Sequence, residues 1–154
     1  MKDNVIYSKD LKTLLLCPTG KKDEFVIPNE VEVIGGSAFQ HSYIKSIIVS
    51  DNVETIKDYA FAQTKIESIK IGKNVQAIGD HSFWSTPSLK NVIIDSPSVA
   101  SKIVSVRAYI RLAENRDTIY ISNDITEIGS YITDNYVIET TDKEGYIKYV
   151  KKEV

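Results

Sequence analysis

Apolar residues recur along this chain with a period of 22 residues. The segment VEVIGGSAF at 31–39 returns as VETIKDYAF at 53–61 and as VQAIGDHSF at 75–83. Each copy has valine at its first position, isoleucine at its fourth and phenylalanine at its ninth. Such self-similarity indicates a solenoid, because one unit of this size buries its apolar face only by stacking on its neighbours. We therefore expect the three phenylalanines to fill a shared core. They are Phe39, Phe61 and Phe83.

Between these copies lie short runs in which apolar and polar residues alternate, at 43–50, 65–72, 88–95 and 116–123. Alternation predicts short strands, whose successive side chains point to opposite faces. The first three runs share the spacing Leu/Ile-x-x-Ile/Val-x-Ile/Val, which is the spacing of a leucine-rich repeat. The fourth run departs from it, because Arg116 stands where the first apolar residue should be.

The fourth unit is degenerate and follows an insertion. Its motif copy at 121–133 keeps only Ile125 and Ile128 at the expected places. Within the inserted residues 96–115, Ser96 fits a helix N-cap and Pro97 fits the first helical position, so we predict a helix over 97–114. Its apolar face comprises Val99, Ile103, Val106, Ile110 and Ala113. Its mildly basic side comprises Lys102, Arg107 and Arg111. We interpret that side as a solvated face, with an anionic docking surface as the alternative.

Both ends of the repeat array carry patterns typical of caps, which cover the apolar ends of open solenoids. Residues 5–18 predict a hairpin that covers the first coil through Ile6, Leu14 and Leu16. Residues 134–154 predict a second hairpin that turns at 142–145. Its strand residues are Tyr136, Ile138, Tyr146 and Tyr149. The predicted organisation is a single domain over 1–154: a cap at 5–18, three repeats of 22–23 residues at 24–95, the insertion at 96–115, the degenerate repeat at 116–133 and a cap at 134–154.

The repeat resembles the BspA-like (Treponema pallidum type) leucine-rich repeat, whose unit has an IP-x-x-V-x-x-IG-x-x-AF core. The first unit matches it at Ile27-Pro28, Val31, Ile34-Gly35 and Ala38-Phe39. The second unit has Lys57 in place of the glycine, and the proline is present only in the first. The resemblance implies a right-handed coil of short strands and irregular segments. It also implies cell-surface or secreted proteins that engage host or matrix proteins, or neighbouring cells.

Composition adds few constraints. The chain has 154 residues, a formal charge of −2 and a pI near 5.7, so we expect no nucleic-acid partner, since such binders carry a basic face. No apolar run approaches the roughly 20 residues of a membrane span, and we expect no membrane insertion. The first residues lack the apolar segment of a signal peptide, which leaves a cytoplasmic location open beside the cell surface. The lone Cys17 is expected to be a small buried apolar residue rather than a reactive thiol.

No arrangement of residues suggests catalysis. His41 and His81 occupy different places in their repeats and have no ligands at metal-binding spacing, so we expect no metal or other cofactor. Ser42-x-x-Lys45 matches a Ser-x-x-Lys pattern, but its usual partner motifs are absent and Lys45 begins a predicted strand. The sequence therefore predicts that the protein is not an enzyme.

The remaining candidate is the outer face of the predicted sheet. If the middle residue of each strand points inward, its two neighbours point outward. One outward row comprises Val26, Ile48, Lys70, Ile93 and Tyr120, and the other comprises Glu24, Ser46, Ser68, Asn91 and Thr118. Apolar patches often mark interaction sites. Alternatively, these β-branched residues are present simply because they suit strands.

Two functions follow from this surface. The first is recognition of a protein ligand through Val26, Ile48, Lys70, Ile93 and Tyr120 together with Ser46, Ser68, Asn91 and Thr118. The second is a structural module that associates weakly with itself. Trp84, whose equivalents are Gln40 and Ala62, either packs locally, which we favour, or contacts a partner.

Overall fold

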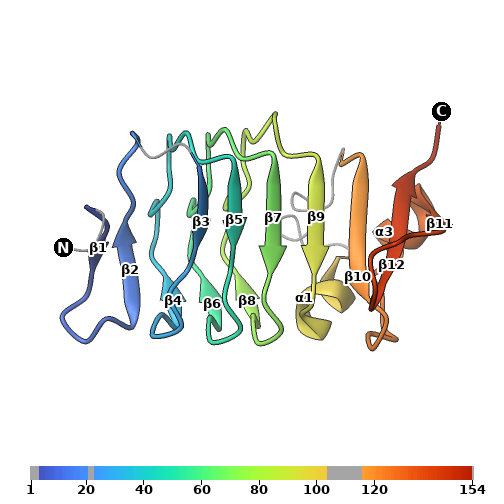
Figure 1. Ribbon diagram of the computed structural model, residues 1–154, viewed down its shortest axis with the longest axis horizontal. Coiled ribbons are helices and arrows are strands. Elements are labelled where there is room, and N and C mark those ends of the chain that lie inside the picture. Colours follow the sequence, from blue (N-terminus) through green and yellow to red (C-terminus); the bar gives the residue numbers. More distant parts are fainter. Residues whose placement is uncertain (1–3, 21–22, 104–115, 154) are drawn as a thin grey trace.

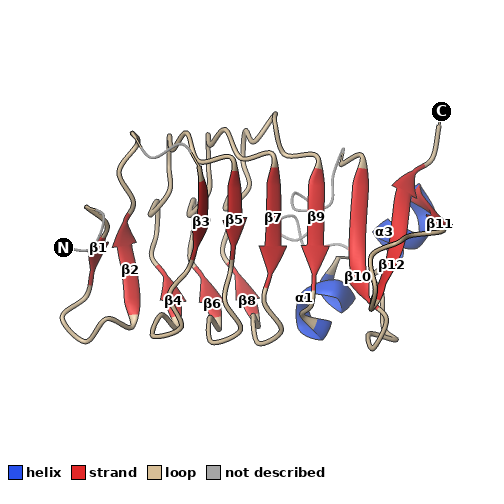
Figure 2. Cartoon of the chain, in the orientation of Figure 1, coloured by secondary structure: helices blue, strands red, loops and turns tan. Residues whose placement is uncertain are grey.

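Each regular repeat forms two short strands, and stacking of the repeats builds two sheets around one core. The structure is a computed structural model that describes residues 4–20, 23–103 and 116–153. Its elements are β1 (Ile6–Tyr7), β2 (Thr13–Leu16), β3 (Glu24–Val26), β4 (Val33–Ile34), β5 (Ser46–Ile48), β6 (Thr55–Ile56), β7 (Ser68–Ile71), β8 (Ala77–Ile78), β9 (Asn91–Ile94), α1 (Pro97–Lys102), β10 (Thr118–Ser122), α3 (Ser130–Asn135), β11 (Tyr136–Glu139) and β12 (Tyr146–Lys151). The predicted solenoid is confirmed, with strands far outnumbering helices in the described chain (Figures 1 and 2).

The larger sheet has seven strands in the order β11-β12-β10-β9-β7-β5-β3. The strands from β3 to β10 are all parallel, as the repeat predicts. A second sheet, in the order β1-β2-β4-β6-β8, runs behind it (Figure 1). The sequence did not predict this sheet, because β4, β6 and β8 have two residues each and are too short to produce an alternating pattern.

The predicted core phenylalanines form a stack along the solenoid axis. Phe61 lies between Phe39 and Phe83, with ring centroids 5.2 and 5.4 Å away and the rings within 24° of parallel. Phe25 adds a tilted ring 5.8 Å from Phe39. The three stacked rings are no more than 1% exposed. Burial of such rings, together with their offset stacking, stabilises each repeat against the next.

The N-terminal hairpin is confirmed, although two of its three proposed covering residues are wrong. β1 and β2 pair antiparallel, and β2 joins β4 in the second sheet. Leu14 is fully buried, whereas Ile6 is 43% and Leu16 is 46% exposed. Ile6 and Leu16 are cross-strand partners in the outermost layer of the solenoid, and only one side of that layer meets the first coil. Val5 and Cys17 are buried on that side instead, so the expectation of a buried Cys17 is confirmed.

The insertion begins with the predicted helix start. The Ser96 hydroxyl accepts the N–H of Val99 at 3.0 Å, and Pro97 is the first residue of α1. The helix ends at Lys102, and residues 104–114 of the predicted range lie outside the described residues. The members of the predicted faces that fall there are Val106, Arg107, Ile110, Arg111 and Ala113. Val99 and Ile103 are buried as expected, and Lys102 is exposed.

The C-terminal hairpin of β11 and β12 is also confirmed, and it does more than cover the end. β12 pairs antiparallel with β10 over five residues and therefore extends the seven-stranded sheet. The short helix α3 precedes β11 and was not predicted. All four predicted strand residues lie in these two strands, and Tyr136 and Tyr149 are buried.

Candidate recognition surface

The two outward rows form ladders across the five parallel strands of the larger sheet. Hydrogen-bonded pairing places Val26, Ile48, Lys70, Ile93 and Tyr120 side by side, and it aligns Glu24, Ser46, Ser68, Asn91 and Thr118 in the same way. The residues between these rows point into the core. These inward residues are Phe25, Ile47, Ile69, Val92 and Ile119, of which Phe25, the most exposed, is only 7% exposed. The strand faces were therefore assigned correctly from the sequence.

The outward residues differ in how far they project. Val26, on the end strand β3, is 54% exposed, and Glu24 and Asn91 are also exposed. The others are half-buried, because neighbouring strands lie only about 4.8 Å apart and adjacent side chains cover one another. The result is an apolar strip that Lys70 interrupts between Ile48 and Ile93.

Lys70 belongs to a polar network that links three strands. Its ammonium lies 2.9 Å from a carboxylate oxygen of Asp95, and the Tyr146 hydroxyl donates to the other oxygen at 2.6 Å. The hydrogen bond to Asp95 raises the pKa of Lys70. Burial, and then the hydrogen bond to Asp95, raise the pKa of Tyr146. Lys70 is therefore charged and Tyr146 neutral at neutral pH, so the network holds a fixed pattern of donors and acceptors.

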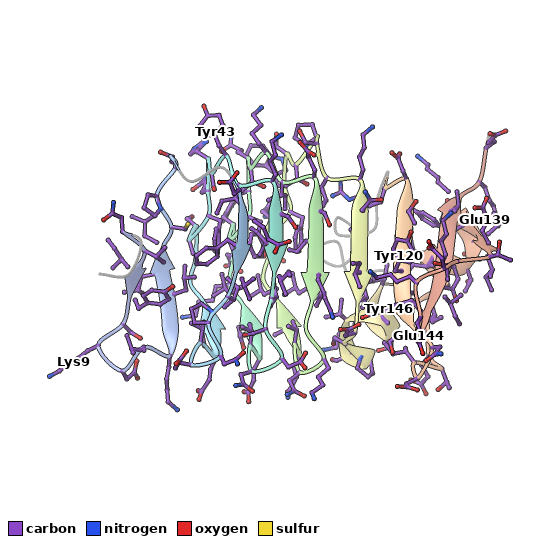
Figure 3. The ribbon with its side chains drawn as sticks, in the orientation of Figure 1. Lys9, Tyr43, Tyr120, Glu139, Glu144 and Tyr146 are labelled. Carbon is purple, nitrogen blue, oxygen red and sulfur yellow. The ribbon has the colours of Figure 1, made fainter. Side chains whose placement is uncertain are left out.

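One more tyrosine and a second lysine complete the group, which we name the tyrosine–lysine cluster (Lys70, Asp95, Tyr120, Lys143 and Tyr146). The Lys143 ammonium lies 5.7 Å from the Tyr120 ring centroid and 5.4 Å from that of Tyr146. Both distances are within the range of cation–π attraction. Figure 3 shows Tyr120 and Tyr146 together at the C-terminal end of the sheet. A hollow of about 550 Å³ is lined by Tyr146 and Asp95 and also includes Asn74 and Asn123 in its lining.

Sequence reasoning identified Lys70 and Tyr120 but missed the rest of the cluster. Tyr146 aligns with Ser122 through the antiparallel pairing of β12 with β10. The 22-residue period does not extend to that hairpin, so it could not supply the alignment. The alternation of Tyr146 to Tyr149 is the sequence signal for the strand, but a strand pattern does not specify its neighbour.

Arg116 explains why the fourth unit departs from the repeat. Its side chain is only 6% exposed, and the guanidinium donates to the carbonyl oxygens of Leu89 at 2.9 Å and Thr86 at 3.3 Å. It also donates to the Thr86 hydroxyl at 3.1 Å. The Tyr136 hydroxyl accepts the Arg116 N–H at 3.2 Å and donates to its carbonyl at 3.0 Å. This buried arginine satisfies polar groups of the preceding loop where other units place an aliphatic residue, so its role is structural.

The remaining candidate residues do not assemble into a site for chemistry. Trp84 is 41% exposed in a turn of the solenoid. His81 stacks on Tyr59, with ring centroids 5.1 Å apart, and His41 lies in another turn. Among the described residues, no cluster of three His, Cys, Asp or Glu side chains could hold a metal ion. In the same part of the chain, no helix has the length and apolar character to cross a membrane.

Comparisons with known proteins agree with this architecture. Residues 17–139 match the model of the BspA type leucine-rich repeat region in six copies, more than the three regular units and one degenerate unit seen in the sequence pattern. A leucine-rich repeat protein from Eubacterium ventriosum is similar in structure, with a TM-score of 0.55 and 31% identity over 60% of this chain and 26% of that one. The pneumococcal vaccine antigen PcpA gives a TM-score of 0.48 and 22% identity over 64% of this chain and 30% of that one. This chain thus spans less than a third of either protein, and the comparison with curated proteins gave no match. Because the family model covers most of the chain, the protein belongs to the BspA-type leucine-rich repeat family.

Proposed function

We propose that this protein is a non-enzymatic recognition module that binds a protein ligand along the outer face of the seven-stranded sheet. The observation that carries the proposal is the aligned outward face itself. It combines an apolar strip with a tyrosine–lysine cluster whose groups are held in place by hydrogen bonds and cation–π contacts. Rigid aromatic groups beside apolar surface are typical of interface hot spots.

The two halves of the face would serve different purposes. Val26, Ile48 and Ile93 supply apolar area, whose burial provides most of the free energy of association. Tyr120 and Lys143 supply directional contacts at one end, which would fix the orientation of the ligand. The ligand we infer is a folded or extended protein segment with apolar side chains and a polar group that reaches the cluster. We also propose that the module acts at the cell surface or as a secreted protein, with host, matrix or neighbouring-cell proteins as its partners, and the membership of the BspA-type repeat family supports this proposal.

A binding experiment with paired variants tests this proposal. Immobilised protein would be used to isolate partners from extracellular-matrix and serum proteins, and the affinity of a recovered partner would then be measured by surface plasmon resonance. We expect the double variant Ile93→Asp with Tyr120→Ala to weaken binding at least about tenfold, because it removes a central apolar and an aromatic contact. Tyr43→Ala is the matched control, since Tyr43 is 53% exposed at the edge of the solenoid away from the sheet face (Figure 3).

The outcome is decisive in either direction. Unchanged affinity in the Ile93/Tyr120 double variant, with its fold intact by circular dichroism, would place the ligand on another face. Loss of binding in Tyr43→Ala alone would do the same.

A further inference from the structure

The two ends of the solenoid are formed by edge strands of different sheets. At the N-terminal end, the hairpin of β1 and β2 belongs to the five-stranded sheet and projects beyond β3, the end strand of the other sheet (Figure 1). At the C-terminal end, β12 and β11 extend the seven-stranded sheet beyond β10. The opposite layer continues past β8 through α1 and α3, where the Gly129 N–H donates to the Ala100 carbonyl and the Tyr131 N–H to the Ile103 carbonyl. The β1–β2 hairpin therefore projects at one end, and β11 is the outermost strand of the other sheet at the opposite end.

The end strands of the seven-stranded sheet also run in the same direction. β3 and β10 belong to the parallel set, β12 is antiparallel to β10, and β11 is antiparallel to β12. β11 is consequently parallel to β3. If a second copy placed its β3 beside β11, the strands would pair in the parallel sense that the rest of the sheet uses. Edge strands offer backbone groups for such pairing.

An exposed apolar side chain at one end has a matching hollow at the other. Ile138 of β11 lies in the inward row next to the buried Tyr149, yet it is 67% exposed. At the N-terminal end, a hollow of about 510 Å³ has a mainly apolar lining that includes Val5, Tyr7 and Pro28. The hollow opens where the β1–β2 hairpin projects past β3. With β11 beside β3, Ile138 would lie on the same side of the extended sheet as this hollow.

Charged side chains of alternating sign stand at the start of successive strands of the seven-stranded sheet. Successive strands of the solenoid carry opposite charges there, and the ammonium–carboxylate distance is 3.6 Å both between Lys45 and Glu67 and between Lys90 and Asp117. The row begins with the acidic Asp23 and reaches the basic Lys151, whose N–H donates to the carbonyl of Asp117. In a head-to-tail pair, β11, whose uncharged Tyr136 aligns with Lys151, would lie between that lysine and the Asp23 of the next copy.

We propose that copies of this chain associate head to tail, with β11 of one copy pairing in parallel with β3 of the next and Ile138 packing into the N-terminal hollow. The contact is heterologous, because two different surfaces meet, so it leads to open chains rather than closed dimers. The association leaves the outer face of the sheet uncovered and lengthens it. It therefore goes beyond the proposed recognition and does not depend on it.

Sedimentation velocity on the full chain tests the association. We expect the weight-average sedimentation coefficient of the wild type to rise with concentration up to about 1 mM, where interactions with millimolar Kd become populated. Ile138→Asp should abolish that rise, because it introduces a charge into an apolar contact. Tyr43→Asp is the matched control, since it also places aspartate at an exposed apolar position, but away from both ends. Thermal unfolding checks that each variant is folded.

A disulfide experiment tests the orientation. In a Cys17→Ala background, one variant would carry Glu24→Cys on β3 and the other Val137→Cys on β11, which belong to the same outward row. Parallel neighbours in a sheet bring such residues within disulfide range. We expect the mixture to give the 24–137 disulfide under oxidation and neither variant alone to form a dimer.

Three results would overturn the proposal. The first is a wild-type chain that stays monomeric at all concentrations. The second is association that Ile138→Asp leaves unchanged or that Tyr43→Asp abolishes equally. The third is preferential formation of 24–24 or 137–137 disulfides, which would indicate a two-fold contact instead.

Discussion

Gly79 gives the most direct test of how closely successive coils stack. Its N–H donates to the carbonyl of Ile56 in the preceding coil at 2.7 Å. A Cβ built on Gly79 would lie 2.7 Å from the carbonyl carbon of Lys57 and still closer to the amide nitrogen of Asp58. Real Cβ contacts are longer than this, so an alanine there would push two stacked backbones apart. Gly36 is the matched control, because a Cβ there would lie 3.5 Å from its nearest neighbour, the carbonyl oxygen of Asp58, at an ordinary packing distance.

The two substitutions should change the free energy of unfolding in opposite directions. Replacing glycine by alanine reduces the conformational entropy of the unfolded chain and stabilises a compatible site by about 0.4–1 kcal/mol. We expect this gain for Gly36→Ala. At Gly79 the same gain is outweighed by overpacking, which costs about 1–3 kcal/mol. Gly79→Ala should therefore be less stable than the wild type, by about 1–2 kcal/mol.

Urea unfolding, followed by far-UV circular dichroism and by the fluorescence of the single tryptophan Trp84, measures both values. Equal m-values in the wild type and the two variants would show that the three proteins expose the same surface on unfolding, so that their free energies of unfolding can be compared. A Gly79→Ala protein as stable as the wild type, or a loss of similar size in Gly36→Ala, would refute the close backbone stacking on which this reasoning depends.

Three further predictions concern the core and its buried polar groups. Phe61→Ala should lower the free energy of unfolding by about 3–5 kcal/mol, since it leaves a cavity between two stacked rings, and stability within 1 kcal/mol of wild type in urea titrations would argue against the phenylalanine stack. Arg116→Lys should cost about 2 kcal/mol, because an ammonium cannot replace the planar fork that reaches Thr86 and Leu89; a melting temperature equal to wild type would contradict this role. Burial raises the pKa of Tyr136 to about 12, so the folded state retains a proton that the unfolded chain loses near pH 10. The contribution of Tyr136 to the free energy of unfolding is therefore present below pH 10 and is lost as pH rises toward 12, by about 3 kcal/mol in total. Tyr136→Phe should flatten the fall in unfolding free energy that is measured between pH 9 and 12. If the curves of the wild type and the variant run parallel, this assignment is wrong.

The repeat period was enough to predict the solenoid, because stacking places equivalent residues in equivalent surroundings. Phe39, Phe61 and Phe83 are buried for that reason, and the outward rows align because every strand repeats the same inward position. The departures from the period were harder to interpret. Arg116 was recognised as an exception, but its role depends on carbonyl groups of a loop whose geometry no local pattern specifies.

The candidate site was only partly predictable for a similar reason. Lys70 and Tyr120 lie within the periodic strands, so their alignment follows from the sequence. Tyr146 and Lys143 reach the same surface through an antiparallel hairpin that pairs with the last periodic strand. Such long-range pairing is decided by packing of the whole end of the solenoid. The second sheet was missed because two-residue strands carry no periodic signal, although their isoleucines were correctly predicted to be buried.

The claim that the outer face of the sheet binds the ligand is tested most directly by site-specific photo-cross-linking. A photoreactive amino acid would replace Ile93 at the centre of the face in one variant and Tyr43 at the edge of the solenoid in another. Each variant would be irradiated with the protein partner recovered by affinity isolation, and the adducts would be mapped by mass spectrometry. We predict a strong adduct from position 93 and none above background from position 43. An adduct from position 43, with none from position 93, would contradict the account.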